Sequence, residues 1–277
     1  EVLDAVDALI RAAFASLSPA ERKRIEGIGC AVPGILNREG GTVLHAANIP
    51  ALSGFSICTT LFELYRVPVN LEEASRAMAL SEIWFTGCRR DNFICIDAGF
   101  GIGMGIVFSG RLYRGNSELS GEIGHTVVDP RGSRCSCGKR GCLETVASGR
   151  ALTDLAASMD FSPYGVHGRD AKALAEAAAK GCAEAVHALE RAGRRIGVAV
   201  ANTINLFDPG VIILNGGLVQ AGGIFVDPIR EAVHSHCIGY GGNIPQVQVS
   251  TLGLRAGALG ASIVPLLGFF EFENIRF

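Results

Sequence analysis

The sequence GEIGHTVVDPRGSRCSCGKRGCLE, residues 121–144, places three carboxylates, one histidine and three cysteines within one short segment. The cysteines follow the spacing C-x-C-G-x-x-G-C, in which the two glycines let the chain fold back on itself. A structural zinc ion takes four cysteine or histidine ligands in a tetrahedron and keeps no open position. The segment therefore predicts a zinc-binding loop with the ligands His125, Cys135, Cys137 and Cys142.

Clustered cysteines also occur as buried apolar side chains and as disulfide bonds. Zinc is favoured over both, because a small glycine-rich loop seldom buries thiols and a cytoplasmic protein keeps its thiols reduced. Arg134, Lys139 and Arg140 would offset the negative charge of three thiolates. The remaining cysteines lie in apolar or helical stretches and are interpreted as small buried side chains: Cys30, Cys58, Cys88, Cys95, Cys182 and Cys237.

The composition is that of a globular protein. Of 277 residues, 48% are hydrophobic and 19% are charged, which suits one large domain or two lobes. The net charge of −2 predicts no general attraction to polyanions, so contact with nucleic acid needs a local basic patch or a segment outside this sequence. The chain starts without a signal-peptide pattern and has no apolar run of membrane-spanning length. These features predict a cytoplasmic protein without a membrane partner.

Stretches typical of strands alternate with stretches typical of helices. Residues 25–34, 67–73 and 211–219 have the apolar character of buried strands. Between 93 and 115, two β-rich runs flank a loop with alternating glycines, as in a hairpin that approaches another group closely. Helical periodicity covers residues 1–17, 55–66, 74–87, 144–159 and 170–204, and again 258–270, where Pro265 would kink or restart the helix. The alternation indicates an α/β fold.

The segment GEIGH followed by C-x-C-G-x-x-G-C-L-E resembles the signature of the ROK family, which contains sugar-responsive transcriptional repressors and sugar kinases. The resemblance extends over nearly the whole chain and is closest to the repressor branch. Further segments similar to the family are CAVPGILN (30–37), NIP (48–50), LEEASRAMALSE (71–82), GFGIGMGIVFSGRLYRG (99–115), NLFDPGVIILNGGL (205–218) and GALGAS (257–262).

The resemblance implies an actin-like (ribonuclease H-like) sugar-kinase fold with two lobes, a zinc-binding loop and a ligand in the cleft between the lobes. Residues 1–84 and 263–277 would form a small lobe whose N-terminal strands are missing from this sequence. Residues 85–262 would form a large lobe with the zinc loop and dimerisation helices. A homodimer or homotetramer is therefore expected.

The resemblance also implies a sugar site supported by the zinc loop. His125 would bind zinc through one ring nitrogen and a sugar hydroxyl through the other, while Glu122 and Glu144 would accept hydroxyl hydrogen bonds. Asn48 would add an amide from the opposite lobe. The simpler alternatives are that the two glutamates are surface charges or indirect supports of the site, and that Asn48 is a turn residue.

The position of the catalytic base separates kinase from regulator. Kinases of the family carry this base as the Asp of an E-N-D-A-N segment. Counting back from Leu80-Ser81-Glu82 puts Ala74 at the Asp and Glu73 at the preceding Asn. An alanine cannot take a proton from the sugar hydroxyl. A slip of one residue would offer Glu73 as a substitute carboxylate.

Two further departures from the kinases affect segments that would lie near the phosphates of ATP. Phe100 stands where the kinases have the threonine of a G-T-G hairpin, and the N-terminal Asp-Gly-Gly-Thr loop is absent. Gly216 and Gly217 stand where the family's adenosine-side loop lies, although strand ends commonly use glycine as a turn residue.

These departures predict a protein that is not an enzyme. It would be the sugar-binding effector domain of a ROK-family transcriptional regulator, which controls operator DNA through an N-terminal helix-turn-helix outside this sequence. The alternative is an ATP-dependent sugar kinase, glucokinase-like or N-acetylhexosamine kinase-like.

Overall fold

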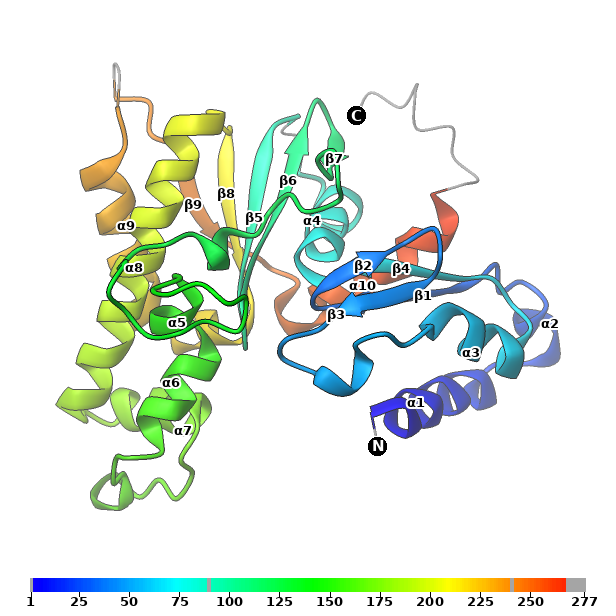
Figure 1. The fold of residues 1–277 in the computed structure, drawn as a ribbon, viewed down its shortest axis with the longest axis horizontal. Coiled ribbons are helices and arrows are strands. Elements are labelled where there is room, and N and C mark those ends of the chain that lie inside the picture. Colours follow the sequence, from blue (N-terminus) through cyan, green and yellow to red (C-terminus); the bar gives the residue numbers. More distant parts are fainter. Residues whose placement is uncertain (1, 89–90, 240–241, 268–277) are drawn as a thin grey trace. The chain divides into compact units, whose positions relative to one another are not determined.

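The computed structural model describes residues 2–88, 91–239 and 242–267, which form two compact units (Figure 1). The first unit contains the chain up to Glu73 and again from Ala261, and the second contains Ala74–Gly260. Each unit has its own buried core, so each is described by itself.

The first unit contains two pairs of short strands. Strand β1 (Ile28–Val32) runs parallel to β4 (Val69–Glu73), and β2 (Ile35–Asn37) pairs with β3 (Thr42–His45) in an antiparallel hairpin. A Cβ at Gly29 would lie 1.7 Å from the carbonyl oxygen of Ala261, so glycine lets the end of α10 approach β1 closely. The helices of this unit are α1 (Val2–Ser16), α2 (Pro19–Arg22), η1 (Pro50–Leu52), α3 (Ile57–Tyr65), the end of α10 (Ala256–Ile263) and η6 (Val264–Leu266).

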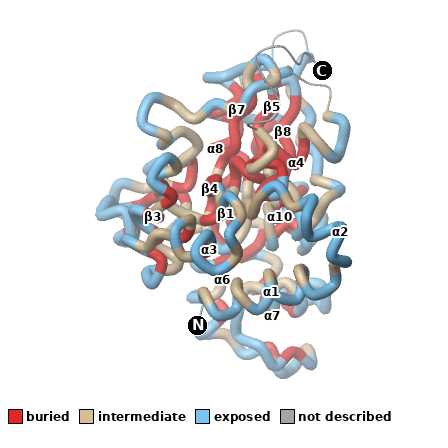
Figure 2. Tube along the Cα trace, turned by 90° about the vertical axis from the view of Figure 1, so that its right-hand side faces the viewer, coloured by how far each residue is buried: buried red, intermediate tan, exposed pale blue. Residues whose placement is uncertain are grey.

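The core of the first unit is small. It is formed by buried residues of the strands and of α3, while α1 contributes none that is fully buried (Figure 2). The short helix α2 forms because Ser18 caps it: the Ser18 hydroxyl accepts the Glu21 N–H while the Glu21 carboxylate accepts the Ser18 N–H. In the last described part of the chain, the expected helix over 258–270 ends at Ile263, and a new turn that contains Pro265 begins at Val264. Residues 268–270 lie outside the described residues.

A five-stranded sheet forms the centre of the second unit, in the order β7-β6-β5-β8-β9. Strands β5, β8 and β9 are parallel, whereas β6 and β7 are antiparallel to their neighbours, so the carboxyl ends of β5, β8 and β9 lie at one edge. The strands are β5 (Phe93–Ala98), β6 (Ile102–Phe108), β7 (Arg111–Tyr113), β8 (Val211–Asn215) and β9 (Gln246–Val249).

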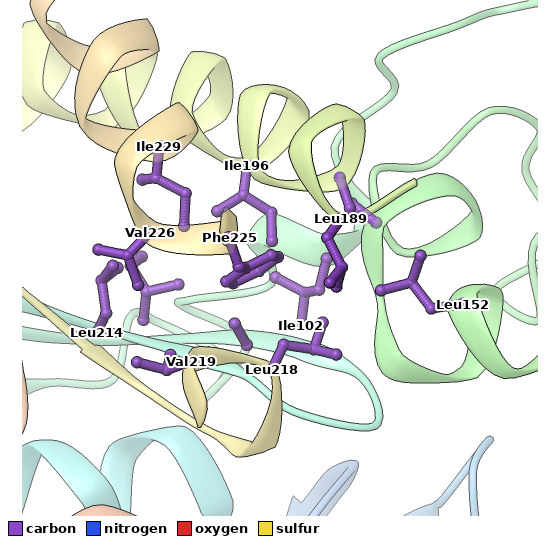
Figure 3. Close-up of a cluster of buried hydrophobic side chains, with 14 of the residues drawn as sticks. Ile102, Leu152, Leu189, Ile196, Leu214, Leu218, Val219, Phe225, Val226 and Ile229 are labelled. Carbon is purple, nitrogen blue, oxygen red and sulfur yellow. The ribbon is translucent and has the colours of Figure 1, made fainter. Parts of the chain in front are cut away.

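Helices cover both faces of this sheet. Helices α8 (Ala183–Phe207) and α9 (Gly223–His236) lie on one face, where Phe225, Val226 and Ile229 belong to the same buried cluster as Leu214 of the sheet (Figure 3). Helix α4 (Ala74–Phe85) lies on the other face and packs on β5 and β6. This packing groups α4 with the second unit, whereas the family resemblance placed residues up to 84 in the small lobe.

The second unit also contains shorter helices. They are η2 (Ile123–His125), α5 (Glu144–Ala147), α6 (Gly149–Ala156), η3 (Ser162–Tyr164), α7 (Ala171–Ala179), η4 (Gly217–Ala221), η5 (Gly253–Arg255) and the start of α10. In the described part of the chain, no helix combines the length and apolar character of a membrane span.

Candidate functional site

Four side chains of the 121–144 segment converge on one point. His125 lies on η2, Cys135 and Cys137 lie in the following loop, and Cys142 precedes α5; one ligand atom from each lies within 4.8 Å of all the others. The distance from Cys135 Sγ to His125 Nδ1 is 3.4 Å, and that from Cys137 Sγ to Cys142 Sγ is 3.6 Å. A tetrahedral zinc ion requires about 3.6 Å and about 3.8 Å for these two kinds of separation. The four residues therefore fit zinc.

Glycines make this convergence possible. Gly138 and Gly141 have left-handed backbones with φ of 89° and 69°. A Cβ at Gly141 would lie 1.5 Å from the carbonyl oxygen of Asp129, so no other residue fits there. The folded-back loop is closed by a hydrogen bond from Cys135 N–H to the Lys139 carbonyl, 2.8 Å, and by a bridge between Arg134 and Arg140.

The thiols of the cluster are not disulfide-bonded, because 3.6 Å far exceeds a sulfur–sulfur bond. The expectation that the loop would not bury thiols is wrong for two of the three, since Cys135 and Cys142 are buried and only Cys137 is exposed. The pKa of the Cys142 thiol is raised to about 12, first by burial and then by the adjacent thiols. Burial also acts to raise the pKa of Cys137, but the Lys139 backbone N–H and the neighbouring thiols lower it overall.

The predicted sugar ligands of this unit flank the loop. His125 presents Nδ1 to Cys135, while its Nε2 lies 3.8 Å from Oε2 of Glu122. Glu144 is the first residue of α5, and its Oε2 accepts a hydrogen bond of 3.2 Å from the Ile102 N–H. Gly124 lies against the carbonyl of the same Ile102, so the start of β6 is next to both segments. One imidazole and two carboxylates thus belong to segments that contact the start of β6.

Asn48 lies in the first unit, between β3 and η1. Its Oδ1 is buried and has no hydrogen-bond partner among the described residues. Such an acceptor is costly to leave unpaired, which is unusual for a simple turn residue. Its contact with a sugar remains a prediction, because it belongs to a different unit from Glu122, His125 and Glu144.

The boundary between β4 and α4 falls at the predicted base position. Strand β4 ends at Glu73 and α4 begins at Ala74. The preceding carboxylate, Glu72, is completely buried and lies 3.5 Å from the Arg38 guanidinium, so it is a structural ion pair. Glu73 is half-buried and donates its backbone N–H to Glu72 Oε1. The Arg38–Glu72 pair has no signal in the sequence, because its members are far apart along the chain.

The glycine hairpin between β5 and β6 ends in an exposed aromatic ring. Phe100 is 56% exposed, so it fills no pocket in the protein core. The backbone of this tip is held by α6, whose first N–H groups, from Gly149 and Arg150, donate to the carbonyls of Gly99 and Phe100. The tip is therefore rigid in its backbone and open around its side chain.

The model of the ROK family matches residues 2–266. The chain belongs to the ROK family. The glucokinase of Thermotoga maritima is 32% identical over 271 residues, which cover 93% of this chain and 84% of that protein. The xylose repressor of Caldicellulosiruptor bescii is 31% identical over 269 residues, which cover 93% of this chain and 66% of that repressor. The family likeness thus includes both branches rather than the repressor branch alone.

Among solved structures, a ROK family glucokinase from Streptomyces griseus in complex with glucose and AMPPNP superposes with a TM-score of 0.83. It is 31% identical, and the match covers 94% of this chain and 86% of that one. The α/β fold of ROK sugar kinases is thereby confirmed. The prediction of a non-enzyme is wrong: relatives named glucokinase match this chain over most of its length, and they point to a kinase. The departures at Ala74 and Phe100 are outweighed by this similarity over most of the chain.

Proposed function

We propose that the chain is an ATP-dependent sugar kinase of the glucokinase type, acting in the cytoplasm where ATP is available. The observation that carries this proposal is the match to glucokinases over 93% of the chain, with a solved relative that binds glucose and AMPPNP. The carboxylates and the histidine of the second unit are suited to recognise the hydroxyl groups of a sugar.

The sugar would be bound by fixed acceptors. Glu144 uses Oε2 for the Ile102 N–H, which holds the carboxylate while Oε1 accepts a sugar hydroxyl. His125 Nε2 and Glu122 offer further acceptors, and the buried Oδ1 of Asn48 is a fourth. Fixed acceptors discriminate among sugars, because a missing hydroxyl leaves one of them unpaired.

We propose zinc as the ion held by His125, Cys135, Cys137 and Cys142. Its function would be structural, because four protein ligands leave no position for a substrate. With Nδ1 committed to the metal, the imidazole can no longer rotate, and Nε2 stays directed toward Glu122.

The transfer step needs a proton acceptor and a nucleotide. The sugar hydroxyl oxygen bonds to the γ-phosphorus of ATP as the bond to ADP breaks, and the hydroxyl proton moves to a carboxylate. Ala74 cannot take this proton. Glu73, the carboxylate next to it at the end of β4, is the proposed acceptor.

Sugar-dependent ADP release tests the kinase proposal directly. Wild-type protein with magnesium, ATP and a panel of hexoses and N-acetylhexosamines should release ADP with at least one of them, and glucose is the first choice. Calorimetry with the same sugars, without ATP, measures binding separately. Sugar binding without any ADP release would overturn the kinase proposal.

A sugar-sensing function in a transcriptional regulator is the second candidate. It is favoured by Ala74 and by the match to a xylose repressor over 93% of the chain. The bound sugar would then change the affinity of an attached DNA-binding segment for operator DNA. A homodimer or homotetramer is proposed for either function.

A further inference from the structure

A buried polar network crosses the face of the sheet that α4 covers. Glu82 of α4 is only 2% exposed, and its Oε1 accepts hydrogen bonds from Ser250 Oγ, 2.5 Å, and from Asn215 Nδ2, 3.3 Å. Asn215 Nδ2 also donates to Cys95 Sγ on β5, 3.2 Å. Ser250 Oγ accepts the Leu252 N–H, 3.1 Å. The network therefore ties α4, the end of β8 and the exit of β9 together.

Asn215 is an unexpected residue for its position if only stability mattered. The other residues of β8, Val211–Leu214, are apolar and buried, and Asn215 itself is only 3% exposed. Its Oδ1 is buried and has no hydrogen-bond partner in the described part of the chain. A buried, unpaired acceptor destabilises a fold. The Nδ2 group serves the fold by donating to Glu82 and Cys95, but Oδ1 adds only a cost, so the amide has a further use.

The place of Asn215 indicates that use. It is the last residue of β8 and lies in register with Asp97, near the end of the parallel strand β5. Ligands of open α/β sheets bind beyond the carboxyl ends of parallel strands. The turn that leaves β8 at this edge is Gly216–Gly217, directly after Asn215.

The fold requires glycine at only one of the two positions of this turn. Gly216 has a φ of 99°, and a Cβ there would lie 2.4 Å from the carbonyl carbon of Ala98, so the chain itself demands glycine. Gly217 has no such left-handed φ, and a Cβ there would have no atom within 4 Å. The fold therefore does not need glycine at 217. The missing side chain leaves bare backbone beside open space, as a closely approaching ligand requires.

We propose that Asn215 is a positioning residue for the nucleotide of the proposed kinase reaction, on which this inference rests. Held by Glu82 and Cys95, it fixes the end of β8 so that the Gly216–Gly217 turn presents its bare backbone to the nucleotide. Two consecutive glycines are otherwise free to adopt many conformations, and ordering them on binding would weaken affinity. Ser250 donates the second hydrogen bond to Glu82 Oε1 and so helps to fix this carboxylate.

The test compares three variants with the wild type. Asn215→Leu removes the amide at nearly constant size, and Gly217→Val fills the open space without entering the core. Gly257→Ala is the control, because its Cβ would meet only Met78 Cε at an ordinary 3.8 Å. Calorimetry measures the affinities for AMPPNP with magnesium and for glucose, and thermal unfolding measures the melting temperature.

Both Asn215→Leu and Gly217→Val should weaken AMPPNP binding by roughly tenfold or more and raise the KM for ATP, with unchanged glucose affinity. Asn215→Leu takes one donor from the buried Glu82 carboxylate and should lower the melting temperature modestly, and Gly257→Ala should behave as wild type. Unchanged AMPPNP affinity in both variants, equal loss of glucose affinity, or no AMPPNP binding by the wild type would each overturn the proposal. If the wild-type protein binds AMPPNP but releases no ADP, weaker AMPPNP binding by the variants would still support the positioning role of Asn215. Only the kinase proposal would then fail.

Discussion

The Nε2 atom of His125 lies 3.8 Å from Oε2 of Glu122, while the opposite ring nitrogen faces the cysteine cluster. A metal ion on one side of the ring would therefore set the orientation of the hydrogen-bonding nitrogen on the other. Zinc removal should consequently weaken sugar binding as well as stability.

Purified protein should contain one zinc per chain, and Cys137→Ser should lose it. Because metal-binding energy is partly folding energy, the variant should melt at a lower temperature and bind glucose more weakly. Elemental analysis, thermal unfolding and calorimetry measure these effects. Cys58→Ser, in the other unit, is the control and should retain its zinc. Wild-type protein that is free of metal and equally stable after treatment with a chelator would contradict the prediction.

Alanine substitutions at two glycines of the loop should differ in their effect. Gly138→Ala meets no neighbour within 4 Å and should cost only the left-handed backbone energy, about 1–2 kcal/mol. Gly141→Ala places its Cβ on the Asp129 carbonyl oxygen and should cost about 3 kcal/mol or more, with loss of zinc. Chemical unfolding and metal content measure both. Equal effects would show that the close approach at Gly141 is not needed for the metal site.

Glu144→Ala should weaken glucose binding about ten- to a hundredfold, because a hydrogen bond to a charged group contributes about 1.5–3 kcal/mol. Calorimetry measures the affinity. Glu176→Ala, on an exposed part of α7, is the matched control and should leave it unchanged. If Glu144→Ala binds glucose as the wild type does, the sugar site lies elsewhere.

Ala74→Asp should raise kcat for sugar phosphorylation by about 10²-fold or more, because it restores a carboxylate at the family's base position. Ala74 is the first residue of α4, where an acidic side chain is compatible with the helix dipole, so folding should not suffer. Coupled measurement of ADP release gives kcat, and calorimetry confirms that glucose affinity is retained. A kcat no higher than that of the wild type would show that position 74 does not face the reacting hydroxyl.

Glu73→Gln should lower the turnover of the wild-type protein by about 10²- to 10⁴-fold while glucose binding persists, since the amide cannot accept the proton. Glu63→Gln, on α3 of the same unit, is the control and should keep full turnover. Undiminished turnover of Glu73→Gln would mean that another group accepts the proton.

Much of the secondary structure and the four residues of the possible metal site could be predicted from the sequence alone. The helices at 2–16 and 74–85 and the strands at 28–32 and 211–215 follow from apolar periodicity, which is a local property. Strand β9 and helix α9 are among the elements that were not predicted. Strand β9, QVQV, lies at the edge of the sheet and has little buried apolar surface, and α9 begins with glycine and contains Pro228.

Other properties were decided only by the tertiary structure. The spacing of the cysteines predicted the residues of the possible metal site, which the structure brings together. Packing determined that two of their thiols are buried, and that one ring nitrogen of His125 faces the cluster while the other faces Glu122. The hydrogen bond between Asn215 and Glu82 joins residues separated by 133 positions. No local pattern encodes such a pair, because burial brings distant polar groups together only when the whole sheet and its covering helix have formed. Spacing along the chain predicts which groups are available, and packing decides which of them meet.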